Sequence, residues 1–181
     1  IRRTKFETTF AGGVGLRGDY SAIFNYAMKV SPVDESNLNQ SLIIVTPNTI
    51  DYGGITEMWE DGSTIAFCPL SEDTYPYDAR GIIQHEAGGH GFGKLGDEYI
   101  YHNGFIEFCC PLDFATLNHG KSLGWYENLS LTGKMHEVPW AHLIFDDRYS
   151  DVVDIYEGGF MHSRGVFRSE QNSCMNNNIS Y

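Results

Sequence analysis

Residues 85–99 of this chain read HEAGGHGFGKLGDEY, and the rest of the sequence can be interpreted outward from them. The acid Glu86 follows the first of two histidines, His85 and His90, and two further acids, Asp97 and Glu98, come shortly afterwards. Zinc hydrolases use such imidazole and carboxylate ligands, usually three from the protein, and keep a fourth position for water. We therefore predict a zinc site with His85 and His90 as ligands.

The spacing of the two histidines predicts an unusual helix. In the common HExxH motif the histidines are four residues apart on an α-helix and face one metal ion. Here they are five apart, and an α-helix would splay their side chains by about 140°. Hydrogen bonding from i to i+5 brings such side chains nearly into line. Gly88 and Gly89 ease this geometry, so we predict a π-bulge within a helix over 77–93 that begins near Asp78.

The third metal ligand is expected just after this helix. Gly93, three residues past the second histidine, allows the helix to end and the chain to turn. Asp97 is our first candidate for the third ligand, Glu98 is the first alternative, and Glu107 is a weaker one. Any of these carboxylates would complete the ligand set of a hydrolytic zinc site.

The acid beside the first ligand predicts how hydrolysis would proceed. Glu86 is expected to act as the general base for a water whose pKa zinc lowers. A second group must stabilise the oxyanion that forms. His162 and Tyr156, both in the second half of the chain, are the candidates for this role.

Composition predicts one globular domain over residues 1–181, because the chain is 41% hydrophobic and 20% charged. The 24 acidic residues outnumber the 12 Lys and Arg residues, and the formal net charge of −12 argues against a nucleic-acid partner. The only basic cluster is Arg2, Arg3 and Lys5, which we expect to be solvated. No stretch approaches the roughly 18 apolar residues of a membrane helix.

The cysteines and the first residue bear on the compartment. The chain begins at Ile1 without a signal peptide, so we expect a processed protein or a fragment, and a secreted, periplasmic or cell-surface location. The four cysteines match no zinc-finger or redox motif, and two disulfides or four free thiols are both compatible with their even number. Adjacent Cys109 and Cys110 would bond each other only with strain, so bridges would run to Cys68 or Cys174.

Hydrophobic periodicity predicts an α+β (or α/β) fold with a small mixed sheet and an active-site helix. The expected elements are a helix over 20–30 capped by Asp19, strands over 42–46 and 63–68, a helix over 114–123, and a helix or strand over 140–145. Residues 158–181 are rich in Gly, Ser and Asn and are expected to be mostly loop. The second half is therefore predicted to be loop-rich.

These residues resemble the IgA-peptidase family of bacterial zinc metallo-endopeptidases, whose hallmark looks like HExxHxxGxLxDEY. Residues 90–99 match the HxxGxLxDEY part at every fixed position, and the extra residue between the histidines departs from it. Dipeptidyl-peptidase III is similar only in having HExxxH, which implies that the insertion is compatible with zinc. Further likeness lies in residues 6–13, 42–46, 52–54 and 158–175.

The family is similar to the metzincins, so the resemblance implies a metzincin-like zincin domain. It implies that Met175, in the Asn172–Met175 stretch, lies as an apolar floor beneath the zinc. It also implies that the strand over 63–68 binds the substrate by strand addition. A metzincin usually has a further helix after this methionine, and we expect that helix to be missing or to lie outside this chain.

Taken together, the sequence predicts a zinc-dependent metallo-endopeptidase acting on a protein or peptide substrate. The family name implies immunoglobulin cleavage, but one motif cannot identify a substrate. A first alternative is a non-catalytic binding module on a peptidase fold, for which Trp59, Trp125 and Trp140 could supply an aromatic platform. A second alternative is a zinc amidase acting on cell-wall peptides.

Overall fold

The computed structural model describes residues 5–10, 13 and 15–179. It divides into two compact units, Ile1–Gly93 and Lys94–Tyr181, and each contains helices and a small sheet. The α+β fold class is therefore confirmed, while a single catalytic domain over 1–181 stays a prediction. Arg2 and Arg3 of the predicted basic cluster lie outside the described residues.

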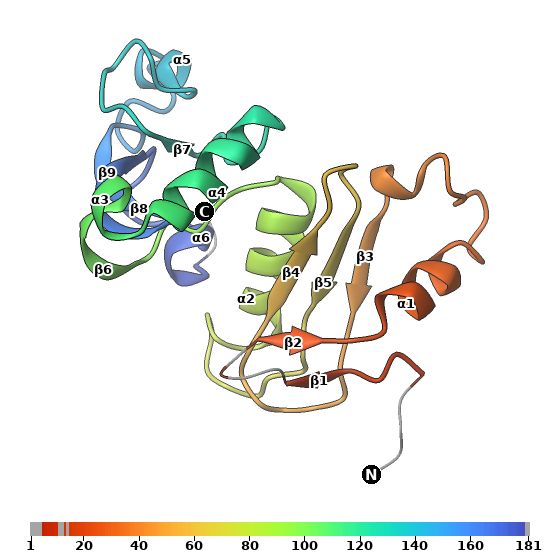
Figure 1. The fold of residues 1–181 in the computed structure, drawn as a ribbon. Helices are drawn as coiled ribbons and strands as arrows, with labels where there is room; N and C mark the ends of the chain where they lie inside the picture. Colours follow the sequence, from red (N-terminus) through yellow and green to blue (C-terminus); the bar gives the residue numbers. More distant parts are fainter. Residues whose placement is uncertain (1–4, 11–12, 14, 180–181) are drawn as a thin grey trace. The chain divides into compact units, whose positions relative to one another are not determined.

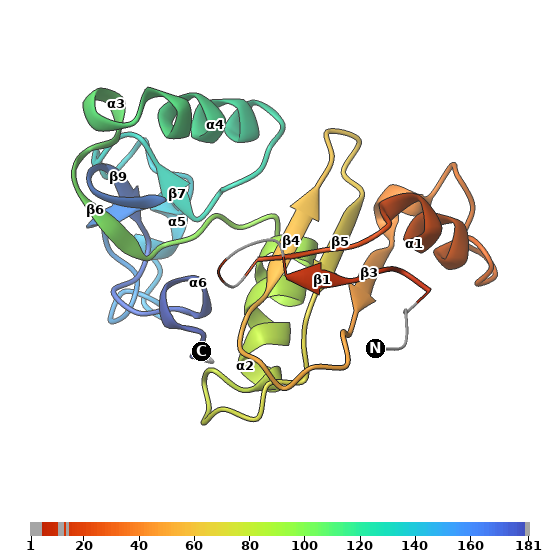
Figure 2. The same ribbon diagram turned by 60° about the horizontal axis from the view of Figure 1, so that its bottom comes forward.

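The first unit is built on a three-stranded sheet in the order β3-β5-β4, with β3 parallel and β4 antiparallel to β5. Figure 1 shows the helix that begins with α2 lying along this sheet, and Figure 2 shows the same helix behind β4. The elements are β1 (Thr9–Phe10), β2 (Leu16–Arg17), α1 (Tyr20–Ala27), η1 (Leu38–Gln40), β3 (Leu42–Val45), β4 (Ile55–Met58), β5 (Thr64–Phe67), α2 (Ala79–Ile82) and the π-helix η2 (Ile83–Phe92).

Strand β5 is buried on both faces, which explains its uninterrupted apolar sequence. Ile65 and Phe67 pack against Ile23 of α1 in one cluster. Alternate residues of a strand point to opposite faces, and Ala66 accordingly packs against Ile82 on the other side. The central strand thus supports the helix that carries the two histidines.

The central position of β5 contradicts the predicted substrate strand over 63–68. Both edges of β5 are already paired with neighbouring strands, so its backbone cannot accept an added peptide strand. The edges of this sheet are instead β3 and β4, of which β4 is antiparallel to its neighbour. A strand-addition role in this unit therefore has to pass to an edge strand.

The second unit contains a four-stranded sheet in which β6 is parallel to β9, while β7 and β8 are antiparallel to β9. Its elements are β6 (Ile100–Phe105), α3 (Ile106–Cys109), α4 (Pro111–Ser122), β7 (Leu129–Ser130), α5 (Ala141–Ile144), β8 (Tyr156–Gly159), β9 (Met161–Arg168) and α6 (Cys174–Asn177). None of the helices in the described part of the chain is long and apolar enough to cross a membrane.

The predicted loop over 158–181 is wrong, because β9 is the longest strand among the described residues. Its buried face carries His162, Val166 and Arg168, so it lacks the apolar alternation that identifies a strand. Arg168 is held there by hydrogen bonds from Nη1 to the Gly158 carbonyl (2.7 Å) and the Glu157 carbonyl (3.2 Å). Buried polar groups with local partners therefore hid this strand.

Candidate functional site

The predicted π geometry at the histidine pair is confirmed. Asp78 caps the helix by accepting hydrogen bonds from the backbone N–H groups of Arg80 and Gly81. After one α-helical turn, the segment Ile83–Phe92 continues as π-helix. The Gly93 N–H donates to the Gly88 carbonyl at 2.9 Å, five residues back. The extra residue between the histidines is thus absorbed within the helix.

This geometry brings the two imidazoles together. The ring centroids of His85 and His90 are 4.9 Å apart at an interplanar angle of 84°, and their ligand atoms lie within 4.8 Å of each other. His85 is buried and His90 is half-buried. Two neutral imidazoles from one helix are typical zinc donors, so this pair fits two of the three ligands that the sequence predicts.

Glu86 is buried against strand β4, and two residues determine where its carboxylate lies: Thr56, which bonds to it, and Gly54, which leaves space for it. The Thr56 hydroxyl is 2.9 Å from Glu86 Oε2 and 2.8 Å from the Glu86 backbone carbonyl, so it can donate to either. A Cβ at Gly54 would lie 2.8 Å from Oε1 and 2.9 Å from Cγ of Glu86. The carboxylate therefore occupies space that only glycine leaves open at position 54.

The thiol of Cys68, just after β5, also lies near this carboxylate. Cys68 is fully buried. Burial, and then the negative charge of Glu86, raise the pKa of the Cys68 thiol to about 12. This cysteine is therefore a neutral core residue at physiological pH, and among the described cysteines it forms no disulfide.

The helix ends where the sequence predicts, although a different residue makes the turn. Gly93 is the C-cap with a right-handed φ of −77°, and the following Lys94 adopts the left-handed conformation with φ of 51°. Asp97 comes three residues later, half-buried, and its backbone carbonyl accepts a hydrogen bond from the Phe160 N–H (2.8 Å). Its role as third ligand stays a prediction.

The alternative ligands Glu98 and Glu107 have other environments in the second unit. Glu98 is buried, with Oε2 accepting from the Ser173 hydroxyl (2.5 Å) and Oε1 from the Asn128 amide (2.9 Å). Burial raises the pKa of Glu98. Glu107 is an exposed residue of the short helix α3. Both oxygens of Glu98 are thus engaged within its own unit, which favours Asp97 as the ligand to test first.

His162, a predicted oxyanion stabiliser, is fully buried on β9. Its Nε2 lies 2.9 Å from Asp113 Oδ2, and its Nδ1 lies 3.4 Å from Cys109 Sγ. Because both ring nitrogens already have partners, we leave His162 out of the hydrolytic mechanism. Tyr156, the other candidate, is half-buried on β8, and its role stays a prediction.

Met175 has the burial that the metzincin resemblance implies, since its side chain is fully buried in α6. Its carbonyl accepts a hydrogen bond from the Glu98 N–H (2.8 Å), and its N–H donates to the Ser173 hydroxyl (3.2 Å). These bonds fix the methionine beside the residue that follows Asp97. Its place beneath a metal ion stays a prediction.

No model of a known protein family matches the chain, and no curated protein does. The site therefore rests on its own residues. Gly54 and Thr56 are functional candidates that the motif does not contain. The Gly53–Gly54 pair preceding β4 is the sequence signal that could have indicated a close approach at this point.

Proposed function

We propose that this chain is an exported zinc-dependent metallo-endopeptidase with a metzincin-like zincin site. The observation that carries the proposal is the π-helical turn that sets His85 beside His90, with a buried carboxylate, Glu86, in the same turn. Nothing in ordinary helix propensity favours two glycines between these residues, since each costs roughly 1 kcal/mol against Ala.

His85 and His90 of the first unit would hold the zinc ion, and Asp97 is the third ligand that the sequence predicts. When bound, zinc acts as a Lewis acid that lowers the pKa of water and polarises a carbonyl. The two imidazoles are neutral donors, and Asp97 adds only one negative charge. A ligand set with so little negative charge leaves the zinc ion a strong Lewis acid. Two of these three donors come from one rigid helix, as a precise site needs.

Glu86 would accept a proton from the attacking water on its carboxylate and later pass that proton to the leaving amine. The Thr56 hydroxyl, 2.9 Å from Oε2, holds the carboxylate in one orientation. The glycine at position 54 provides the space in which Oε1 sits. The base is thus positioned by β4 as well as by its own helix.

The strand that supports this base also offers a place for a peptide substrate. β4 (Ile55–Met58) is an edge of its sheet, and Thr56 belongs to it. A peptide that added to β4 by main-chain hydrogen bonds would run beside the residue that positions Glu86. We therefore propose β4, in place of β5, as the substrate strand.

The first experiment measures zinc content and hydrolysis of a mixed-sequence fluorogenic peptide library for the wild type, His90→Ala and Asp97→Asn. We expect His90→Ala to lose one equivalent of zinc and the peptidase activity, and a chelator to abolish activity that added zinc restores. Loss of the same equivalent in Asp97→Asn would establish the third ligand. Zinc retained in Asp97→Asn would assign that ligand to Glu98 or Glu107.

The result that would overturn the proposal is equally direct. A wild-type protein that hydrolyses no peptide after zinc is restored, and whose zinc content does not change in His90→Ala, is not a zinc peptidase. Circular dichroism of each variant serves as the folding control. Thr132→Ala, a change in the loop that follows β7 in the second unit, should leave zinc content and activity unchanged.

A further inference from the structure

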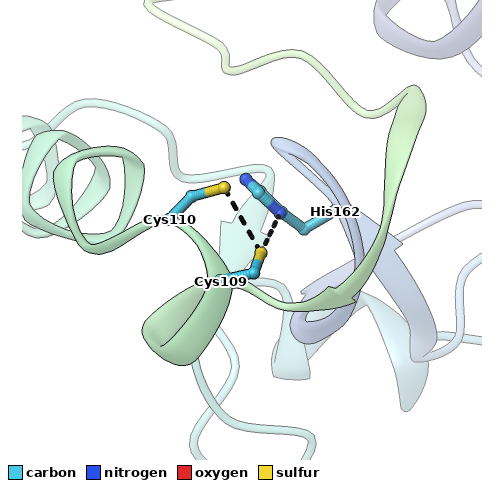
Figure 3. Close-up of side chains that lie close together, drawn as sticks. All are labelled: Cys109, Cys110 and His162. Atoms are coloured by element: carbon cyan, nitrogen blue, oxygen red, sulfur yellow. Dashed lines mark hydrogen bonds between the residues drawn. The ribbon is translucent and has the colours of Figure 1, made fainter.

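A second group of metal-ligating side chains lies wholly within the second unit. Cys109 ends α3, Cys110 precedes α4, and His162 projects toward both sulfurs from β9 (Figure 3). Cys109 Sγ lies 3.3 Å from Cys110 Sγ and 3.4 Å from His162 Nδ1. All three ligand atoms lie within 4.8 Å of one another.

These separations are close to those of a tetrahedral metal site. Tetrahedral zinc bonds of about 2.0 Å to nitrogen and 2.3 Å to sulfur would place two sulfurs roughly 3.8 Å apart, and a sulfur and a nitrogen roughly 3.5 Å apart. The Cys109 Sγ–His162 Nδ1 pair, at 3.4 Å, has this spacing, and the two sulfurs, at 3.3 Å, would separate by roughly 0.5 Å around an ion. The remaining pair, Cys110 Sγ and a ring nitrogen of His162, lies within 4.8 Å.

A carboxylate orients the histidine as a ligand requires. Asp113 Oδ2 lies 2.9 Å from His162 Nε2, so Nε2 carries the proton that it donates to the carboxylate. The lone pair then lies on Nδ1, the nitrogen that faces Cys109. Metal-binding histidines usually have such a carboxylate partner on the other ring nitrogen. His102 on β6 stacks on the ring with a centroid distance of 5.3 Å and further fixes its plane.

The cluster is also accessible to an ion. Cys109 is exposed and Cys110 is half-buried, whereas the imidazole of His162 is fully buried. A buried histidine with two sulfurs at the surface offers an ordered ligand on the inside and an entry path on the outside. The two other cysteines, Cys68 and Cys174, are buried elsewhere.

We propose that Cys109, Cys110 and His162 bind a thiophilic divalent cation, zinc in the first place, with Asp113 holding the imidazole. Two thiolates and one imidazole select zinc over calcium or magnesium, which prefer oxygen ligands. Three protein ligands leave one coordination position for water or an added ligand. None of these residues takes part in the proposed peptidase mechanism, so this site stands or falls independently of that function.

The test is a titration of the reduced full-length chain with Co²⁺, used as a spectroscopic probe in place of zinc. A thiolate-to-cobalt charge-transfer band must come from sulfur ligands, and the predicted set His85, His90 and Asp97 contains none. We expect the band to saturate at one equivalent, to disappear in Cys109→Ser, and to require roughly 10–100-fold more Co²⁺ in Asp113→Asn, which keeps all three ligands. Zinc should displace the cobalt and abolish the band.

Cys174→Ala is the matched control, because it removes a thiol outside the cluster and should retain the band. Absence of the band in the reduced wild type would overturn the proposal. Retention of the full band in Cys109→Ser would also overturn it, since the sulfur would then come from another cysteine. Since Cys109 is exposed, its serine variant is expected to fold, and Asp113→Asn provides an independent test with both thiols intact.

Discussion

The two candidate metal sites are built in opposite ways. The histidine pair comes from one helix and is only five residues apart, so the geometry of that helix alone brings the rings together. In the second unit, Cys109 and His162 are 53 residues apart and meet because α3 packs against β9. A site within one helix can be recognised from the spacing of its residues in the sequence. A site whose residues come from a helix and a distant strand can be recognised only in the folded structure.

The chemistry of the two sites differs as much as their construction. The first offers imidazoles with a predicted carboxylate, the ligand class of hydrolytic zinc. The second offers two sulfurs and one imidazole, with a carboxylate behind the ring. Changes at one site should therefore leave the spectroscopic and catalytic signals of the other unchanged.

The largest effect is expected for Glu86→Gln, which keeps the shape of the side chain but removes the base. General-base catalysis contributes about 10²–10⁴-fold, so kcat for peptide hydrolysis should fall by that factor. The zinc content should stay at the wild-type value, because Glu86 is not a ligand. The measurement is kcat on the peptide library beside zinc content of the same samples.

A variant that loses zinc together with activity would contradict the assignment, since Glu86 would then be a ligand. Glu57→Gln is the matched control, because it makes the same chemical change one residue from Thr56 on β4. Its carboxylate accepts a hydrogen bond from the Tyr20 hydroxyl (2.8 Å), and successive residues of a strand point to opposite faces, so Glu57 points away from the face of Thr56. Activity should be close to wild type.

The second effect concerns alkylation of the thiols, which should differ between buried Cys68 of the first unit and exposed Cys109 of the second. Because the pKa of Cys68 rises to about 12, its thiolate at pH 8 is roughly 10³-fold scarcer than that of a thiol with the ordinary value near 9. Alkylation of the folded protein should therefore label exposed Cys109 first, and Cys68 only after unfolding. Peptide mapping after a short iodoacetamide pulse measures this order.

The pH dependence of the same thiol has a definite sign. The folded pKa lies above the unfolded one, so the folded state keeps the Cys68 proton longer. The free energy of unfolding should then fall as the pH rises from about 9 toward about 12. Cys68→Ala should reduce this slope. Rapid labelling of Cys68 in the folded protein at pH 8 would contradict its burial.

A smaller effect is expected where β4 meets the base. Gly54→Ala puts a methyl group 2.8 Å from Glu86 Oε1 and must displace the carboxylate. Displacing a catalytic group by about 1 Å can cost up to 10²-fold, so kcat should fall roughly 10–100-fold with zinc retained. Gly53→Ala is the neighbouring control. Unchanged kcat in Gly54→Ala would contradict a catalytic need for the open space at position 54.

Much of the first unit could be predicted from the sequence because its signals are local. Asp19 and Asp78 cap helices by accepting backbone hydrogen bonds, as their positions indicate. The apolar runs predict the strands β3 and β5. The run over 42–46 predicts a buried strand, but Leu42 and Ile44 of β3 are exposed, whereas β5 is buried on both faces. The π-helix follows from the five-residue spacing and two glycines. What the sequence did not show was the order of the strands, since β3 and β4 flank β5 only through long-range pairing.

The second unit was harder to predict because its buried residues are partly polar. His162 faces inward on β9 and pairs with Asp113. Arg168 also faces inward, with Nη1 bonded to the Gly158 carbonyl and its Nε without a hydrogen-bond partner among the described residues. The four successive residues 158–161, where β8 ends and β9 begins, all have positive φ. Two of them, Phe160 and Met161, are not glycine, so the sequence gives no turn signal at these two positions. The Cys109–Cys110 pair matches no metal-binding motif in the sequence, and its proximity to His162 depends on the same hidden strand.

The smallest effect should separate tight packing in the active-site helix from its π geometry. A Cβ at Gly81 would lie 1.8 Å from the Pro76 backbone carbonyl oxygen, which cannot move aside as a side chain can. Gly81→Ala should therefore destabilise the fold by about 1–3 kcal/mol. Gly88 is exposed, and a Cβ at this position would lie 4.0 Å from the nearest atom beyond the neighbouring helical residues, the Ile83 carbonyl oxygen. Gly88→Ala should therefore be neutral or stabilising by up to about 1 kcal/mol. Urea unfolding measures both. If Gly88→Ala were the more destabilising variant, the π-helical backbone would need glycine at position 88. The alignment of His85 and His90 would then depend on that glycine as well as on their five-residue separation.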